Sequence, residues 1–282
     1  MFKYMGSTRA DLNNVQTEIL SSLPSSLGGF ETFLEEPFKV FSQPNILAEG
    51  TFQDLTQELD LFLSGLEKNQ DRNGKLTTTF TECPTKRAVP FPTLRDFIRA
   101  FFGADFRAWF MRTHLPFFPG ERVWWAQSGF SHATVALWNK TVGRIVPAAK
   151  YRPLRISVEL SDLGPDAFIP PHTDSAWKRM ALVFYCPPFP VSEEMRESWG
   201  TVFWQRKVDG RSMDSWATSH QTGENEERFR ENYEVALTVP YEANRINGFI
   251  KSKNSWHSVA RNELMVPRRA VVINVVEIGL ST

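Results

Sequence analysis

The sequence predicts an α+β fold in which N-terminal helices pack on one sheet of an antiparallel β-sandwich or barrel. Two observations support this: helical periods occur only in the first 120 residues, and short strand-like runs fill the remainder. The chain has 282 residues, of which 41% are apolar and 23% are charged. That composition excludes disorder, collagen and coiled coil. We expect one domain over 1–282, helical over about 1–120 and mainly β over about 121–282.

Helices are expected at three places in the first 120 residues. The first ends near Leu23, where Pro and Gly residues follow. The second covers 52–68, where apolar residues recur with a helical period and acidic residues occupy the other face. The third covers 93–113, with Thr93 as its capping residue and a break at 103–105. The first half is therefore expected to consist mainly of helices and loops.

Eight short apolar or alternating runs begin at about residue 122, separated by Gly, Pro, Asn and Asp. They cover residues 122–127, 133–139, 154–160, 180–186, 200–205, 233–239, 245–250 and 268–276. Their spacing favours antiparallel sheets over βαβ units. A polar stretch at 206–232 interrupts the series and is too long for a hairpin turn, so we expect a lid or surface excursion there.

The charge balance and the N-terminal sequence bear on the partners and the cellular location of the protein. Lys+Arg and Asp+Glu are both 32, a formal net charge of +0, which gives no support to a nucleic-acid or anionic-membrane partner. No apolar run approaches ~18 residues, and the N-terminus lacks the pattern of a secretory signal. Two cysteines, Cys83 and Cys186, favour reduced thiols over a disulfide framework. We expect a soluble cytoplasmic protein and leave its oligomeric state open.

An imidazole and a carboxylate stand two positions apart at His172 and Asp174. On extended backbone such residues point to the same face, so both can bind one cation. His257 lies far downstream, just after the strand-like run 245–250, and is the candidate third ligand. Two imidazoles and one carboxylate form the facial triad of non-haem Fe(II), which leaves other positions open. The alternatives are a hydrogen-bonded turn for the first pair and a core histidine for His257.

Two arginines, Arg268 and Arg269, open the last strand-like run. An arginine at the start of a buried strand needs a partner, and a carboxylate matches its planar fork. Because side chains alternate along a strand, only one of the two can face a pocket. Lys178 and Tyr185 lie on the segment that leaves Asp174. We interpret Lys178 as a solvated residue.

The other histidines are interpreted as surface or packing residues. His114 ends a predicted helix, where a positive charge at the C-terminus is favourable. His132 and His220 have no recognisable partners nearby in the sequence.

Over roughly residues 151–278 the pattern resembles the Fe(II)- and 2-oxoglutarate-dependent oxygenases, in the style of the prolyl-hydroxylase-like branch. The family's HxD…H signature corresponds to His172, Asp174 and His257. Its basic residue on the distal strand, which binds the far carboxylate of 2-oxoglutarate, corresponds best to Arg268, and its tyrosine to Tyr185.

The resemblance implies a double-stranded β-helix (jelly roll) core with helices packed on one sheet. It also implies Fe(II) as cofactor, with 2-oxoglutarate and O2 as co-substrates and succinate and CO2 as products. The expected reaction is hydroxylation or another oxidation of an unactivated C–H bond. We expect a small-molecule substrate, either an amino acid or a natural-product intermediate. The alternatives are a protein or peptide side-chain hydroxylase and a non-catalytic metal-binding jelly roll.

Overall fold

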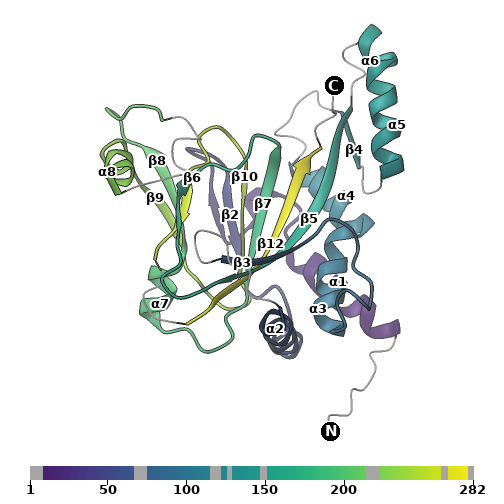
Figure 1. Cartoon of the computed structure of the whole chain (residues 1–282), viewed down its shortest axis with the longest axis horizontal. Helices are drawn as coiled ribbons and strands as arrows, with labels where there is room; N and C mark the ends of the chain where they lie inside the picture. Colours follow the sequence, from purple (N-terminus) through teal and green to yellow (C-terminus); the bar gives the residue numbers. More distant parts are fainter. Residues whose placement is uncertain are drawn as a thin grey trace.

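Two β-sheets face each other in the computed structural model (Figure 1). The structure describes residues 9–66, 75–114, 122–125, 129–146, 151–213, 223–261 and 266–278. The larger sheet has the strand order β1-β2-β10-β7-β12-β5-β3, with β4 also paired to β5. The smaller sheet has the order β6-β11-β8-β9. Strand pairs are antiparallel except β4 with β5, which is parallel.

The strands and helices have the following bounds. The larger sheet consists of β1 (Thr32–Leu34), β2 (Val40–Gln43), β3 (Lys75–Phe80), β4 (Arg122–Trp125), β5 (Tyr151–Leu163), β7 (Lys178–Tyr185), β10 (Ile246–Ile250) and β12 (Arg268–Glu277). The smaller sheet consists of β6 (Ile169–His172), β8 (Thr201–Arg206), β9 (Tyr233–Val239) and β11 (His257–Val259). The helices are α1 (Arg9–Ser22), η1 (Leu27–Gly29), α2 (Glu49–Ser64), α3 (Pro92–Phe102), α4 (Ala104–His114), α5 (Gly129–Lys140), α6 (Val142–Ile145), α7 (Glu193–Ser198) and α8 (Gly223–Asn232).

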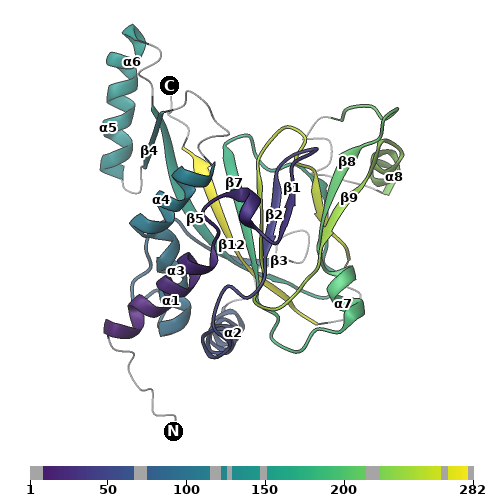
Figure 2. The same ribbon diagram turned by 180° about the vertical axis from the view of Figure 1, so that it is seen from behind.

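The main apolar core lies between the larger sheet and the N-terminal helices. Helices α1, α3 and α4 lie on one side of this sheet and the smaller sheet on the other, in both views (Figure 1, Figure 2). Strand β12 contributes Val271, Ile273 and Val275 to this core, each fully buried. Alternate residues of one strand thus face the helices, as the period of two requires.

A second core fills the space between the two sheets. It contains Ala181 and Tyr185 of β7, Phe203 of β8, Phe249 of β10 and Ala270 of β12. From β5 onward the chain alternates between sheets: β5 is in the larger, β6 in the smaller, β7 in the larger, β8 and β9 in the smaller, then β10, β11 and β12 alternate again. This winding brings β6 and β11, distant in sequence, into direct pairing.

Two glycines are required by close approaches. A Cβ at Gly200 would lie 2.4 Å from the Val239 carbonyl oxygen. A Cβ at Gly248, in the centre of β10, would lie 2.5 Å from Leu182 Cδ2 and 2.6 Å from the Phe41 ring. Both distances are shorter than real Cβ contacts, so no larger residue fits without a shift of the neighbours.

The structure confirms most of the expected elements and corrects three. The three predicted helical regions form α1, α2 and the pair α3 and α4, with the break at Gly103. The run 133–139 is not a strand, because it lies within α5. Thr93 does not cap α3, since the N-cap residue is Phe91, with no side-chain hydrogen bond, and Pro92 begins the helix.

The first half is not only helical, because β1, β2 and β3 also join the larger sheet. Within the predicted excursion 206–232, the described part ends β8 and then forms α8, while 214–222 lie outside the described residues. Among the described residues, no helix is both long and apolar enough to cross a membrane.

His114 is a packing residue, one of the two alternatives expected, but it carries no favourable helix-terminal charge. It is fully buried, and its ring stacks on Phe110 at 4.9 Å between centroids. Burial lowers the pKa of His114 to about 3, so the ring is neutral at physiological pH. His132 lies in α5 and His220 lies outside the described residues.

Candidate metal centre

His172 and His257 are partners in one strand ladder. His172 ends β6 and His257 begins β11, and the two residues pair directly across the smaller sheet. Their ring centroids lie 4.2 Å apart. Opposed residues of an antiparallel pair project to the same face, so both imidazoles lie on one side of the sheet. The two histidines identified in the sequence are therefore brought together by backbone pairing.

Each imidazole is held by its own backbone. His172 Nδ1 lies 2.8 Å from the Pro170 carbonyl oxygen, and His257 Nδ1 lies 3.0 Å from that of Ser255. A carbonyl can only accept, so in a neutral ring the proton is on Nδ1 and the lone pair is on Nε2. Such second contacts fix the tautomer and orientation of metal-binding histidines.

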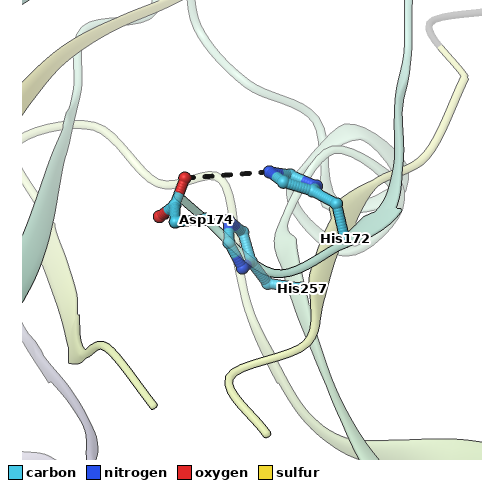
Figure 3. Close-up of side chains that lie close together, drawn as sticks. All are labelled: His172, Asp174 and His257. Atoms are coloured by element: carbon cyan, nitrogen blue, oxygen red, sulfur yellow. Dashed lines mark ion pairs between the residues drawn. The ribbon is translucent and has the colours of Figure 1, made fainter. Parts of the chain in front are cut away.

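Asp174 completes the group. Its Oδ1 lies 4.0 Å from His172 Nε2 and its Oδ2 lies 3.9 Å from His257 Nε2. Figure 3 shows the carboxylate turned toward the ring of His172, with His257 beside it. The ligand atoms of the three residues all lie within 4.8 Å of one another. Asp174 Oδ2 is buried and has no hydrogen-bond partner in the described part of the chain, which makes it a position for a cation.

The electrostatics suit a cation. Burial lowers the pKa of both histidines, that of His257 to about 3, with His172 lowering it further and Asp174 opposing the shift. Burial alone would raise the pKa of Asp174, but Lys178, His257 and His172 outweigh it, and this pKa lies below its ordinary value. The three residues therefore present two neutral nitrogens and one carboxylate, the donor set of a divalent metal site.

Lys178 is not a solvated residue. Its Nζ lies 2.7 Å from Asp174 Oδ1, and its side chain is 18% exposed. The ammonium thus holds one carboxylate oxygen and leaves the other directed at the histidines. The sequence offered no signal for this contact beyond the spacing of four positions.

The two arginines of β12 face opposite sides of the sheet. Arg269 faces the helices and forms ion pairs with Asp60 of α2 and Asp162 of β5. Arg268 faces the smaller sheet, is 5% exposed and forms no ion pair with any described residue. Its Nε donates to the Trp199 carbonyl oxygen at 2.8 Å, while its Nη2 is buried and meets no hydrogen-bond partner in the described ranges. Of the two arginines, Arg269 is thus neutralised by carboxylates, whereas Arg268 is not paired with one among the described residues.

Tyr185 lies beside the Arg268 guanidinium, whose Cζ is 5.2 Å from the tyrosine ring centroid. The phenol oxygen lies 2.6 Å from Thr201 Oγ1 and accepts a hydrogen bond from Asn247 Nδ2 at 2.6 Å. Asn247 Oδ1 has no partner. This polar group lies in the middle of an otherwise apolar core, where unpaired atoms are costly.

The polar group is close to the metal centre. Thr201 and Phe203 of β8 pair with Val259 and His257 of β11, so Thr201 lies two positions along the strand from the histidine. Two strand positions correspond to about 7 Å. The polar group and the three metal-ligand candidates therefore line one space between the sheets.

Comparisons with known proteins give shape similarities only. No family model and no curated protein sequence matches the chain. A prolyl-4-hydroxylase from Pseudomonas putida is 10% identical, with 86% of this chain and 94% of that chain covered and a TM-score of 0.46. A prolyl 4-hydroxylase from Phytophthora capsici is 12% identical, with 98% and 68% covered and a TM-score of 0.49. HygX from Streptomyces hygroscopicus, in a structure with nickel, 2-oxoglutarate and hygromycin B, is 11% identical, with 84% and 82% covered and a TM-score of 0.39.

Three residues of the site were not found by sequence reasoning. They are Thr201, Asn247 and Tyr241, whose ring centroid lies 5.1 Å from the Arg268 Cζ. Thr201 follows Gly200 at the start of β8, and Asn247 precedes Gly248 in β10. A polar residue inside a buried strand was the available signal for both.

Proposed function

We propose that this protein is an Fe(II)- and 2-oxoglutarate-dependent oxygenase built on a double-stranded β-helix. The observation that carries the proposal is the convergence of His172, Asp174 and His257, with an unpaired Asp174 oxygen directed at two Nε2 atoms. The alternation of β5 to β12 between the two sheets supports the jelly-roll core. The donor set fits Fe(II), which is held by two histidines and one carboxylate in such enzymes.

The residues of the chain have separate roles at the proposed metal site. His172 and His257 bind through Nε2, because Nδ1 of each is held by a backbone carbonyl. Lys178 fixes Asp174 through Oδ1 and so favours metal binding through Oδ2 alone. Bound Fe(II) supplies the activation of O2, coupled to decarboxylation of 2-oxoglutarate to succinate and CO2, and with it the oxidation of a C–H bond. The apolar walls around His257, Phe203 and Phe249, exclude water from the centre.

Arg268 is the proposed clamp for the far carboxylate of 2-oxoglutarate. Its guanidinium is buried without an acidic partner among the described residues, and a carboxylate would give it a bidentate, charge-assisted contact. Tyr185, with its hydroxyl fixed by Thr201 and Asn247, would contribute a second polar contact beside it. Removal of water from this pocket makes the ion pair stronger than it would be in solvent.

The test is 2-oxoglutarate turnover by the metal-loaded protein. We expect succinate release with Fe(II) that falls at least 100-fold in His172→Ala, together with loss of metal binding, because two ligands hold the ion poorly. Arg206→Gln, an exposed change at the end of β8, serves as the control and should behave as the wild type. Equal turnover in wild type and His172→Ala would exclude the proposed role of the triad.

A small-molecule substrate is proposed, with a peptide side chain as the alternative. Stimulation of succinate release by free metabolites but not by peptides supports the first, and the reverse result supports the second. The alternative of a non-catalytic metal-binding jelly roll is tested by metal analysis after aerobic and anaerobic purification. Stoichiometric zinc without 2-oxoglutarate binding would identify it.

A further inference from the structure

Two cations near the metal centre have no acidic partner among the described residues. Arg155 of β5 has a buried Nε with no hydrogen-bond partner and forms no ion pair there. Lys251 follows β10, and its Nζ donates to the Ser252 carbonyl oxygen at 2.6 Å rather than to a carboxylate. Both side chains are half-buried, and a partly desolvated cation without an anion is a position where a ligand can supply the missing charge.

The strand register places both cations at the end of the larger sheet that carries Lys178. Val276 of β12 pairs with Arg155 on one side and with Lys178 on the other. Arg155 and Lys178 thus lie in one row across three strands. Lys251 adjoins this row, since its backbone N–H donates to the Arg179 carbonyl oxygen at 3.0 Å. Lys178 in turn contacts Asp174.

The acidic residues at this end are already paired. Asp174 accepts from Lys178, Glu277 binds Arg152 and Arg179, and Glu159 binds Lys75 at 2.5 Å. Arg155 and Lys251 therefore remain as excess positive charge. The pKa of Lys251 is lowered by burial, with Asp174 opposing the shift and Lys178 adding to it.

This positive end is distinct from the proposed 2-oxoglutarate clamp. Arg268 is the first residue of β12, and Val276 is the last but one. At the rise of an extended strand, the two positions are separated by roughly 26 Å. The same small dicarboxylate therefore does not account for both Arg268 and Arg155.

We propose that the substrate is an anion, with its negative group bound by Arg155 and Lys251. Its oxidisable C–H bond then faces the metal centre beside Lys178. A carboxylate fits first, because the planar guanidinium fork matches its two oxygens and the flexible stem of a lysine lets an ammonium reach the same group from another strand. A phosphate or sulfate ester shares this chemistry. The inference rests on the proposed function and narrows its substrate class.

The test uses protein loaded with Mn(II) and saturated with 2-oxoglutarate, so that Arg268 is occupied. The probes are acetate, followed by its methyl-proton relaxation, and inorganic phosphate, followed by its phosphorus relaxation. The paramagnetic ion enhances the relaxation of an anion bound nearby. We expect saturable enhancement for acetate, with an apparent affinity at least tenfold weaker in Arg155→Gln and Lys251→Gln. The matched control is Lys253→Gln, an exposed lysine two positions away, which should bind as the wild type does.

Each possible result either supports or contradicts the proposed anion site. Stronger enhancement by phosphate than by acetate would support the anion site and assign it to a phosphate or sulfate ester. Enhancement that persists in Arg155→Gln and Lys251→Gln would mean direct binding of the anion to the metal and would overturn the inference, as would no enhancement in the wild type. Metal and 2-oxoglutarate uptake are measured beforehand, so a protein that takes up neither contradicts the proposed function itself, and the inference falls with it.

Discussion

Similar side chains have different partners on the two faces of the larger sheet, one of which faces the helices and the other the smaller sheet. Arg269 on the first face is neutralised by Asp60 and Asp162. Arg268, the preceding residue on the second face, is equally buried and has no carboxylate among the described residues. The difference teaches that charge pairing, rather than burial, separates a structural arginine from one available to a ligand. The helix-facing side should therefore control stability, and the inter-sheet side should control binding.

The largest expected effect lies on the helix-facing side, at His114. Its pKa of about 3 is below the unfolded value near 6.5, so the unfolded chain binds more protons between these values. The stability that comes from keeping this ring neutral is present above about pH 6.5 and is lost as pH falls toward 3. The maximum loss is roughly 3 to 6 kcal/mol.

Denaturant unfolding at several pH values measures this effect. The wild type and His114→Leu are compared in the presence of a chelator, so that His172 and His257 contribute equally to both. The difference in unfolding free energy should shift in favour of the leucine variant as pH falls. Parallel pH profiles would show that His114 does not carry the acid sensitivity.

The arginine pair gives the next largest effect and the sharpest contrast. Arg268→Met should raise the KM for 2-oxoglutarate about 100-fold, close to 2.7 kcal/mol, because the proposed clamp loses its charge. Arg269→Met should change that KM little and instead lower the unfolding free energy by about 1 to 2 kcal/mol. The loss stays modest because Asp60 is 46% exposed. Reversed results would invert the assignment of the two faces.

A larger side chain at Gly248 tests the packing on the helix-facing side of the larger sheet without changing any charge. Gly248→Ala places a methyl group against Leu182 and the Phe41 ring and should cost about 1 to 3 kcal/mol of unfolding free energy. Gly50→Ala in α2 is the matched control, since a Cβ there meets nothing within 4 Å. That control should be neutral or slightly stabilising. A thermal melt of each variant decides the comparison.

The smallest effect is expected at Asn274, on the inter-sheet side of β12. Its Oδ1 is buried without a partner among the residues that the structure describes, so Asn274→Leu should leave the unfolding free energy unchanged or raise it by up to about 1 kcal/mol. Asn139 provides the contrast, because its side chain makes two hydrogen bonds to Tyr151 and its replacement by leucine should destabilise the chain. Clear destabilisation by Asn274→Leu would show that this polar atom has a structural partner.

The sequence predicted the elements whose signals are local. The strands β5, β7 and β12 come from short apolar or alternating runs and the helices α2 and α3 from a period of 3.6, and they lie where those patterns indicated. The run 133–139 was assigned wrongly, because a short apolar segment cannot be distinguished from a helix by composition alone. In α5 several of these residues remain exposed, including Leu137 at 65%.

The N-terminal strands β2 and β3 could not be predicted, because strands that they pair with are remote in the sequence. Strand β2 pairs with β10, so that Ser42 lies opposite Asn247, near the other end of the chain. Strand β3 pairs with β5 and carries polar residues on one face. Their strand character comes from pairing with an existing sheet, which local propensity does not report.

The metal-ligand candidates were predictable, whereas the groups around them were not. His172 and Asp174 are fixed by their proximity on the chain, and His257 stands out because few histidines exist. Lys178, Thr201 and Asn247 meet the site through loop closure and strand register, which no short motif encodes. The same register sets which face of the sheet Arg268 and Arg269 occupy.

The direct pairing of His172 with His257 has a mechanical consequence. The two residues bound a long segment that includes β7, β8, β9 and β10, and a metal held by both would join its ends as a covalent cross-link does. This metal cross-link would reduce the conformational freedom of the enclosed segment in partly unfolded states, in which β6 and β11 would otherwise separate. Loss of the ion would then loosen the smaller sheet first, and this loosening would be visible as faster amide hydrogen exchange in β6 and β11 than in β7 or β12.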